Sequence, residues 1–244
     1  MAGSTRLRRA KRAAPPSDDR LIVALDAPDL ASALRLATRL RGVVTRVKVG
    51  SVLFTAAGPD AITRMRRLGF EVFVDLKFHD IPSTVEKSCR AAARHRAWML
   101  TVHASGGRPM LEAAMRGVRE ESERRRLPRP LIVGVTVLTS SEEAGALRRV
   151  MALAEDARAA GLDGIVASAQ EARAIRRRFG SSLALVCPGI RPASGERGDQ
   201  RRVATPASAL TDGAGYLVVG RPITEASDPR AAALSIVTEM MEVR

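Results

Sequence analysis

Eight short apolar runs alternate with eight longer amphipathic stretches from Leu21 to the C-terminus. Most of the runs are almost continuously apolar, which is typical of parallel strands buried on both faces. Strict alternation of strands and helices predicts right-handed crossovers and a parallel sheet. We predict strands over 21–26, 44–50, 71–77, 99–104, 131–138, 164–168, 183–189 and 216–220. We predict helices over 29–41, 59–68, 83–96, 109–125, 143–160, 170–178, 206–212 and 229–243.

Eight strand–helix units between residues 21 and 244 fit a closed barrel better than an open, doubly wound sheet, because a (β/α)8 barrel typically takes about 250 residues. No change in composition divides this segment, so the sequence predicts an α/β protein with one (β/α)8 TIM-barrel domain over 21–244. Residues 1–20 mix Arg, Ala, Pro and Ser without apolar periodicity. Such a segment buries too little apolar surface to fold, so we predict a disordered basic tail.

The composition excludes several classes of protein. Aromatic residues make up only 3% of the chain, which disfavours readers of single-stranded nucleic acid because these need stacking surfaces. The two cysteines are too few for a disulfide scaffold or a four-cysteine zinc site. No apolar run approaches the roughly 18 residues of a membrane span, and the basic N-terminus lacks the apolar region of a secretory signal. We therefore expect a cytoplasmic protein without a membrane partner.

The net charge of +14 has three explanations. The simplest is a solvated surface rich in Arg. The alternatives are a nucleic-acid partner and an anionic substrate, and charge alone does not separate them. We favour the solvated surface and regard nucleic acid as the weakest of the three.

Polar residues gather where the predicted strands end, and in this fold the chemistry takes place at that rim. The first strand ends in Asp26, the second carries Lys48, and the third ends in Asp75 and Lys77. Positions two apart in a strand share a face, so Asp75 and Lys77 should both point into the barrel mouth beside Lys48. Alternating carboxylates and ammonium groups tolerate burial and would hold Lys77 charged as a proton donor. The alternative is a structural salt-bridge cluster, but Asp26 and Lys48 at matching strand ends favour the catalytic interpretation.

Two glycine- and arginine-containing loops follow the last two predicted strands. They read PGIRP (188–192) and VVGRPIT (218–224), at the places where this fold often binds phosphate. Glycine allows close approach of the backbone, and an Arg fork matches phosphate oxygens. The sequence therefore predicts a phosphorylated substrate. The three histidines show no zinc-binding spacing, and no dinucleotide fingerprint is present, so we expect no metal and no cofactor.

Together these motifs resemble those of orotidine 5′-phosphate decarboxylases, in their bacterial form, from Leu21 to about Thr238. The D-x-K-x-x-D element alone is shared with related sugar-phosphate decarboxylases and synthases that use magnesium, which remain the main alternative. The later loops are much more specific. The motifs are ALD (24–26), VKVG (47–50), FVDLKFHDIPST (73–84), TVHASGG (101–107), TVLTS (136–140), PGIRP (188–192), GDQRRVATP (198–206) and YLVVGRPIT (216–224).

The resemblance implies an activity and a role for each matching residue at the barrel mouth. The enzyme would convert orotidine 5′-monophosphate into uridine 5′-monophosphate without a cofactor. Asp26 and Lys48 would hold the ribose hydroxyls, and Lys48 would also join the charged network. Asp75 would lie against the substrate carboxylate. Lys77 would protonate carbon 6 of the pyrimidine.

The resemblance also implies a homodimer with shared active sites. Asp80, Ile81 and Thr84 would reach into the site of the partner subunit, with Asp80 completing the catalytic network there. Thr139 would sit near the pyrimidine ring. The phosphate would be bound by Arg191, Gln200, Gly220 and Arg221.

Overall fold

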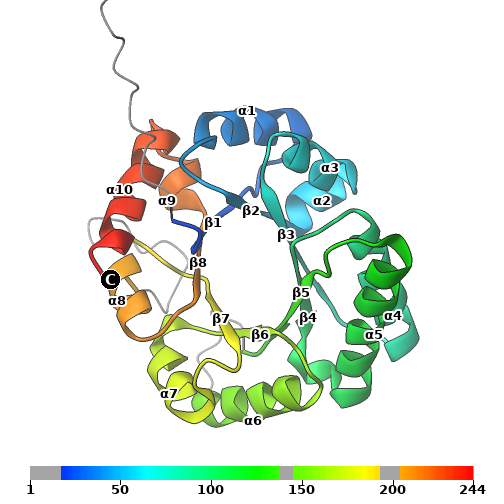
Figure 1. The fold of residues 1–244 in the computed structure, drawn as a ribbon. Coiled ribbons are helices and arrows are strands. Elements are labelled where there is room, and N and C mark those ends of the chain that lie inside the picture. Colours follow the sequence, from blue (N-terminus) through cyan, green and yellow to red (C-terminus); the bar gives the residue numbers. More distant parts are fainter. Residues whose placement is uncertain (1–17, 138–144, 193–203, 244) are drawn as a thin grey trace, which may run out of the picture.

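Eight parallel strands close into a barrel with helices around it, as the alternating pattern predicted (Figure 1). The computed structural model describes residues 18–137, 145–192 and 204–243. Each strand pairs with its neighbours in chain order, and β1 closes the barrel on β8. The strands are β1 (Leu21–Ala24), β2 (Arg46–Gly50), β3 (Glu71–Phe78), β4 (Met99–His103), β5 (Leu131–Val135), β6 (Gly164–Val166), β7 (Ala184–Cys187) and β8 (Tyr216–Val219).

The predicted helices are all present in the described part of the chain, and three short elements were not predicted. These are α2 (Ser51–Ala57), the 3-10 turn η1 (Ala104–Gly106) and α9 (Arg221–Thr224), each of which begins within two residues of the end of a strand. Among the described residues, no helix combines the length and the hydropathy that crossing a membrane requires. The other helices are α1 (Leu30–Leu40), α3 (Asp60–Arg67), α4 (Pro82–Arg94), α5 (Arg108–Arg125), α6 (Ala146–Ala159), α7 (Ala169–Phe179), α8 (Pro206–Thr211) and α10 (Pro229–Met241).

The core has two layers, which explains why the strands are apolar on both faces. In β1, Leu21 and Val23 pack outward against the helices, whereas Ile22 and Ala24 point into the barrel. Because both layers exclude water, the strand sequence lacks the polar alternation of a one-sided sheet. The inner layer consists of Ile22, Ala24, Phe73, Met99, Val133, Val186 and Val218.

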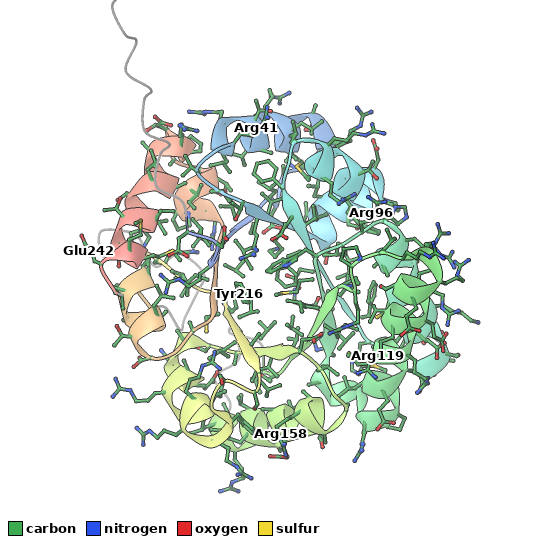
Figure 2. All side chains as sticks on the ribbon, viewed as in Figure 1. Arg41, Arg96, Arg119, Arg158, Tyr216 and Glu242 are labelled. Carbon is green, nitrogen blue, oxygen red and sulfur yellow. The ribbon has the colours of Figure 1, made fainter. Side chains whose placement is uncertain are left out.

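Aromatic and cationic side chains close the N-terminal end of the barrel. The rings of Trp98 and Tyr216 meet edge to face with their centroids 5.4 Å apart. The guanidinium of Arg46 lies 4.3 Å from the centroid of the Trp98 ring, in cation–π geometry. Tyr216 lies near the barrel axis in Figure 2, whereas Arg41 and Arg158 lie at the periphery. The end of the barrel opposite the predicted site is therefore filled by side chains.

Residues 18–20, which the predicted tail of residues 1–20 includes, contact the barrel. Asp18 is buried, and its carboxylate accepts hydrogen bonds from the backbone and the guanidinium of Arg20. Arg20 also donates to the carbonyl oxygen of Met240 at 3.1 Å, and the Thr45 hydroxyl donates to Asp19 at 2.9 Å. These contacts attach residues 18–20 to the barrel. The rest of the predicted tail, residues 1–17, lies outside the described residues.

Part of the Arg excess forms ion pairs between outer helices. Glu121 has a fully buried side chain, and its carboxylate accepts hydrogen bonds from Arg94, Arg124 and Arg125. The hydrogen bond from Arg124, supported by those from Arg125 and Arg94, lowers the pKa of Glu121 to about 2 despite its burial. Arg94, Arg124 and Arg125 are therefore ion-paired residues of the protein surface.

Gly117 provides a test of how closely α4 and α5 pack. A Cβ at this position would lie 2.4 Å from the carbonyl oxygen of Glu86, which is a rigid backbone atom. Alanine normally favours a helix over glycine by about 1 kcal/mol. Here we expect Gly117→Ala to lower the free energy of unfolding by about 1–3 kcal/mol, because the overlap forces the helices apart. Urea unfolding measures the change.

The exposed Glu123→Ala on the same helix is the control, and it should alter stability by about 0.5 kcal/mol or less. Unchanged or increased stability of Gly117→Ala would contradict the expected close contact.

Candidate active site

A cavity of about 540 Å³ opens at the C-terminal ends of the strands. This volume lies within the range of small-molecule sites, about 300–1,000 Å³. Its floor is the apolar interior of the barrel, and its walls carry charged side chains from several strand ends. The charged and polar lining includes Asp26, Lys48, Asp75, Lys77, Arg191 and Arg221.

One wall of the cavity is a network of two lysines and two aspartates. The Nζ atom of Lys77 donates to both carboxylate oxygens of Asp75 at 2.9 Å. The Nζ atom of Lys48 lies 3.5 Å from Asp75 Oδ2 and 3.1 Å from Asp26 Oδ1. The structure thus brings together the four residues that the strand-end pattern predicted, and their roles in catalysis stay predictions.

Burial and charge act in opposite directions on Asp75. Burial alone would raise the pKa of this carboxyl, but the ammonium groups of Lys48 and Lys77 and the hydrogen bonds from Lys77 and Thr101 outweigh it, so the pKa is lowered. Asp75 is therefore ionised at neutral pH. Lys48 is almost fully buried, whereas 36% of the Lys77 side chain is exposed, toward the cavity that it lines. Of the two lysine ammonium groups, that of Lys77 is therefore more accessible to a ligand than that of Lys48.

Asp75 and Lys77 meet through a bulge in β3 rather than through regular strand alternation. Val74 pairs with Leu100 and Phe78 pairs with Val102, so four steps along β3 match two steps along β4. Within this bulge the backbone of Lys77 adopts φ 51°, a left-handed conformation that is unfavourable for a residue with a side chain. Bulges and such backbone outliers concentrate next to active sites.

Two residues that support the network were missed in the sequence. The hydroxyl of Thr101 contacts both the backbone nitrogen of Lys77 and the carboxylate of Asp75. A Cβ at Gly50 would lie 2.7 Å from Lys48 Nζ and 2.9 Å from Asp26 Oδ1. The absence of a side chain at Gly50 therefore leaves room for this ion pair. Both residues lie in motifs that carry the family resemblance, VKVG (47–50) and TVHASGG (101–107), which was the available signal.

The opposite wall carries the two predicted phosphate loops. Gly189 and Arg191 from the loop after β7, and Gly220 and Arg221 from the end of β8, line the same cavity. Burial lowers the pKa of Arg191, and the neighbouring guanidinium of Arg221 lowers it further, while Glu225 acts in the opposite direction. Two guanidinium groups on one wall repel each other unless an anion lies between them, so this wall is suited to phosphate.

Three predicted site residues do not reach the cavity of their own chain. Asp80, Ile81 and Thr84 are exposed at the start of α4, and Ile81 retains 65% of its accessible surface. None of the three lines the cavity. Thr139 and Gln200, the remaining predicted contacts, lie outside the described residues.

The two histidines near the site lie against each other. The rings of His79 and His103 have centroids 5.1 Å apart. Burial lowers the pKa of His103, and His79 and Lys77 lower it further. Within residues 18–137, 145–192 and 204–243, no three side chains of His, Cys, Asp or Glu form a group that could hold a metal ion.

Comparison with known proteins identifies the family. The sequence model described as "Orotidine 5'-phosphate decarboxylase / HUMPS family" matches residues 19–236. The chain belongs to this family. The match covers all eight strands and both walls of the cavity.

Relatives named orotidine 5′-phosphate decarboxylase align over almost the whole chain. The family member from Moorella thermoacetica is 51% identical over 236 residues, which cover 93% of this chain and 94% of that protein. The one from Halorhodospira halophila is also 51% identical, over 92% of this chain and 97% of its own length. A crystal structure of orotidine 5′-phosphate decarboxylase from Lactobacillus acidophilus superposes with a TM-score of 0.79 at 34% identity, covering 91% of this chain and 99% of that one.

Gly50 offers a test of the network that separates site geometry from folding. In Gly50→Ala the new methyl group overlaps only the flexible end of Lys48 and the carboxylate of Asp26, so we expect the folded state to survive. The displaced ammonium should weaken binding of uridine 5′-monophosphate by about tenfold or more, the order of one charge-assisted hydrogen bond. Isothermal titration calorimetry measures the affinity.

Gly58→Ala is the matched control, with the opposite expected result. Gly58 has φ 57° and open space around its Cβ position, so alanine should lower stability by about 1 kcal/mol and leave the affinity unchanged. Equal affinities for Gly50→Ala and the unaltered protein would show that Lys48 does not depend on this space.

Proposed function

We propose that the protein catalyses the decarboxylation of orotidine 5′-monophosphate to uridine 5′-monophosphate, a step of pyrimidine nucleotide synthesis. The observation that carries this proposal is the Asp75-centred network facing a two-arginine wall across one cavity. Family membership supports it, with 51% identity to a protein of that name. A cytoplasmic location is part of the proposal and suits a step of nucleotide synthesis.

The two walls divide the recognition of the substrate. Arg221 and Arg191 hold the phosphate, helped by the backbone at Gly220 and by Gln200. Asp26 and Lys48 hold the ribose hydroxyls next to Asp75, because their ion pair lines the cavity and adjoins that carboxylate. Binding energy from the phosphate then positions the pyrimidine for reaction at its far end. Thr139 contacts the ring.

The chemistry requires a charge to be stabilised where it forms. The bond between carbon 6 and the carboxylate breaks, carbon dioxide leaves, and the electron pair remains on carbon 6. No π system delocalises this vinyl carbanion, so a fixed positive charge must lie beside it. The Lys77 ammonium supplies that charge and then transfers its proton to carbon 6. Lys77 recovers a proton from solvent after the product leaves.

Asp75 keeps this arrangement ready for the reaction. Its ionised carboxylate holds the Lys77 ammonium with two hydrogen bonds, so no reorganisation is needed when the carbanion forms. It also lies on the cavity wall where the substrate carboxylate would approach. Loss of carbon dioxide removes the repulsion between these two carboxylates. Every group in this scheme belongs to the protein, so the proposal includes no cofactor.

We propose a homodimer in which each chain completes the site of the other. Asp80, Ile81 and Thr84 are exposed beside the cavity mouth but line no part of their own cavity, and Ile81 is among the most exposed large apolar residues described. Packing these residues against a second copy would bury Ile81. It would also bring Asp80 to the partner's Lys77, extending the alternation of charges.

The proposed reaction is tested by mixing the purified protein with orotidine 5′-monophosphate and following the loss of its absorbance. Lys77→Ala should lower turnover by at least about 10³-fold, because positioned charge and proton transfer each contribute about 10²-fold or more. Its affinity for uridine 5′-monophosphate should remain measurable. Excess chelator should leave the rate of the unaltered protein unchanged.

The outcomes separate the candidate functions. Near-normal turnover by Lys77→Ala would overturn the mechanism. Activity that is lost in chelator and restored by magnesium would favour the related sugar-phosphate enzymes instead.

The shared site has a quantitative consequence. Asp80→Ala and Lys77→Ala subunits should each be inactive alone. After equal amounts are mixed and allowed to exchange, half of the dimers contain one chain of each kind. In these dimers one site carries both defects and the other carries neither, so about a quarter of the activity per subunit should return if the dimers are closed two-fold assemblies. Exchange verified by mass spectrometry without recovery of activity would place Asp80 in its own subunit's site.

A further inference from the structure

We propose that Thr101 is a positioning residue for the reaction proposed above: its hydroxyl joins the Lys77 backbone to the Asp75 carboxylate and holds both in one arrangement. Thr101 lies outside the lining of the cavity, so it acts through these two residues rather than on the substrate. The inference rests on the proposed function only for its effect on rate. Its structural part stands on the geometry of the bulge.

Thr101 occupies the one β4 position that faces the bulge. β4 pairs with β3 at Leu100 and at Val102, on either side of Thr101, while β3 inserts extra residues between the matching positions. The amide of Lys77 therefore has no regular ladder partner on β4. The Thr101 hydroxyl takes that place, accepting the Lys77 amide hydrogen at a nitrogen–oxygen distance of 2.8 Å.

The same hydroxyl has a second contact, which fixes its direction. Thr101 Oγ1 lies 3.0 Å from Asp75 Oδ1, and an ionised carboxylate can only accept. The hydroxyl hydrogen therefore points to Asp75, and its lone pair receives the Lys77 amide. Backbone, hydroxyl and carboxylate form one continuous chain of hydrogen bonds that leads back to Lys77 through its ammonium group.

Burial makes this hydroxyl difficult to replace. Thr101 is 1% exposed, so removing its oxygen would leave the Lys77 amide without its partner. It would also take one hydrogen bond from Asp75 Oδ1, which would then accept only from Lys77 Nζ. A buried amide left unpaired costs its full desolvation free energy, which exceeds the small net value of a hydrogen bond. The left-handed backbone of Lys77 also requires support, because an unfavourable conformation persists only where the surrounding contacts hold it.

The consequence for catalysis is positional. Lys77 must present its ammonium at one place, and catalytic groups lose much of their effect when displaced by about 0.5–1 Å. Asp75 fixes the ammonium from the side-chain end, and Thr101 fixes both Asp75 and the Lys77 backbone. A threonine that only filled space would be replaceable by valine, which has nearly the same shape but no hydroxyl. That difference makes the inference testable.

The test compares Thr101→Val with Thr101→Ser, which retains the hydroxyl. We expect Thr101→Val to lower kcat by about tenfold or more, the order of one lost hydrogen bond to a charged group. Thr101→Ser should stay within about threefold of the unaltered protein, and the affinity of both for uridine 5′-monophosphate should change by less than about threefold, because this ligand has no carboxylate at carbon 6.

Thr136→Val is the matched control. Thr136 is also buried at a strand end, and its hydroxyl donates to the carbonyl oxygen of Val166 at 2.8 Å rather than to the charged network. Its kcat should stay within about threefold. Equal kcat values for Thr101→Val and Thr101→Ser would overturn the inference. If Thr101→Val does not fold, Thr101→Ala and Thr101→Ser, which differ by a single oxygen, decide by the same comparison.

Amide hydrogen exchange at Lys77, followed by NMR, gives a readout that needs no activity. The Lys77 amide should exchange faster in Thr101→Val than in Thr101→Ser. Similar exchange in both variants would show that Thr101 does not hold the bulge. An unaltered protein that does not decarboxylate orotidine 5′-monophosphate would refute the proposed function, and the exchange comparison would still decide the role of Thr101.

Discussion

The carboxylate of Asp75 is the charge around which the mouth of the barrel is organised. It is largely buried, and an isolated carboxylate in that position would take up a proton instead of remaining ionised. Lys48 and Lys77 prevent this, and each lysine in turn depends on Asp75 for its own place. The bulge in β3, the hydroxyl of Thr101 and the space at Gly50 are all arranged around this mutual dependence. The energetic contributions of these residues are consequently interdependent, and single substitutions do not add up to the stability of the network.

The fold was predictable because its determinant is a pattern repeated along the chain. Continuous apolar runs such as 21–26 mark strands buried on both faces, and their alternation with helices leaves few topologies. What escaped prediction depends on single contacts. Asp18 and Arg20 looked like part of a charged tail, and only their contacts with each other and with Met240 attach them to the barrel. The short helix α2 follows β2 without a turn or a side-chain cap to mark its start.

The candidate site was predictable in its members and less so in its geometry. The rule that chemistry lies at the strand ends brought Asp26, Lys48, Asp75 and Lys77 together correctly. Regular alternation could not reveal the bulge, because an extra residue in one strand is defined only by its pairing with the next. Thr101 was missed for the same reason: its importance comes from facing that bulge across the sheet. The exposed Asp80 and Ile81 line no part of their own chain's cavity, so their role depends on the dimer proposed above.

The aromatic side chains at the N-terminal end of the barrel also determine what tryptophan fluorescence can detect in this protein. Trp98 is the only tryptophan in the chain, and it sits against Arg46 and Tyr216, at the end of the strands away from the cavity. Its emission therefore monitors the packing of the N-terminal end of the barrel, and Trp98 is not among the residues that line the cavity. Intrinsic fluorescence is suited to following unfolding, while occupancy of the cavity has to be observed through the ligand itself or through a tryptophan engineered near the rim.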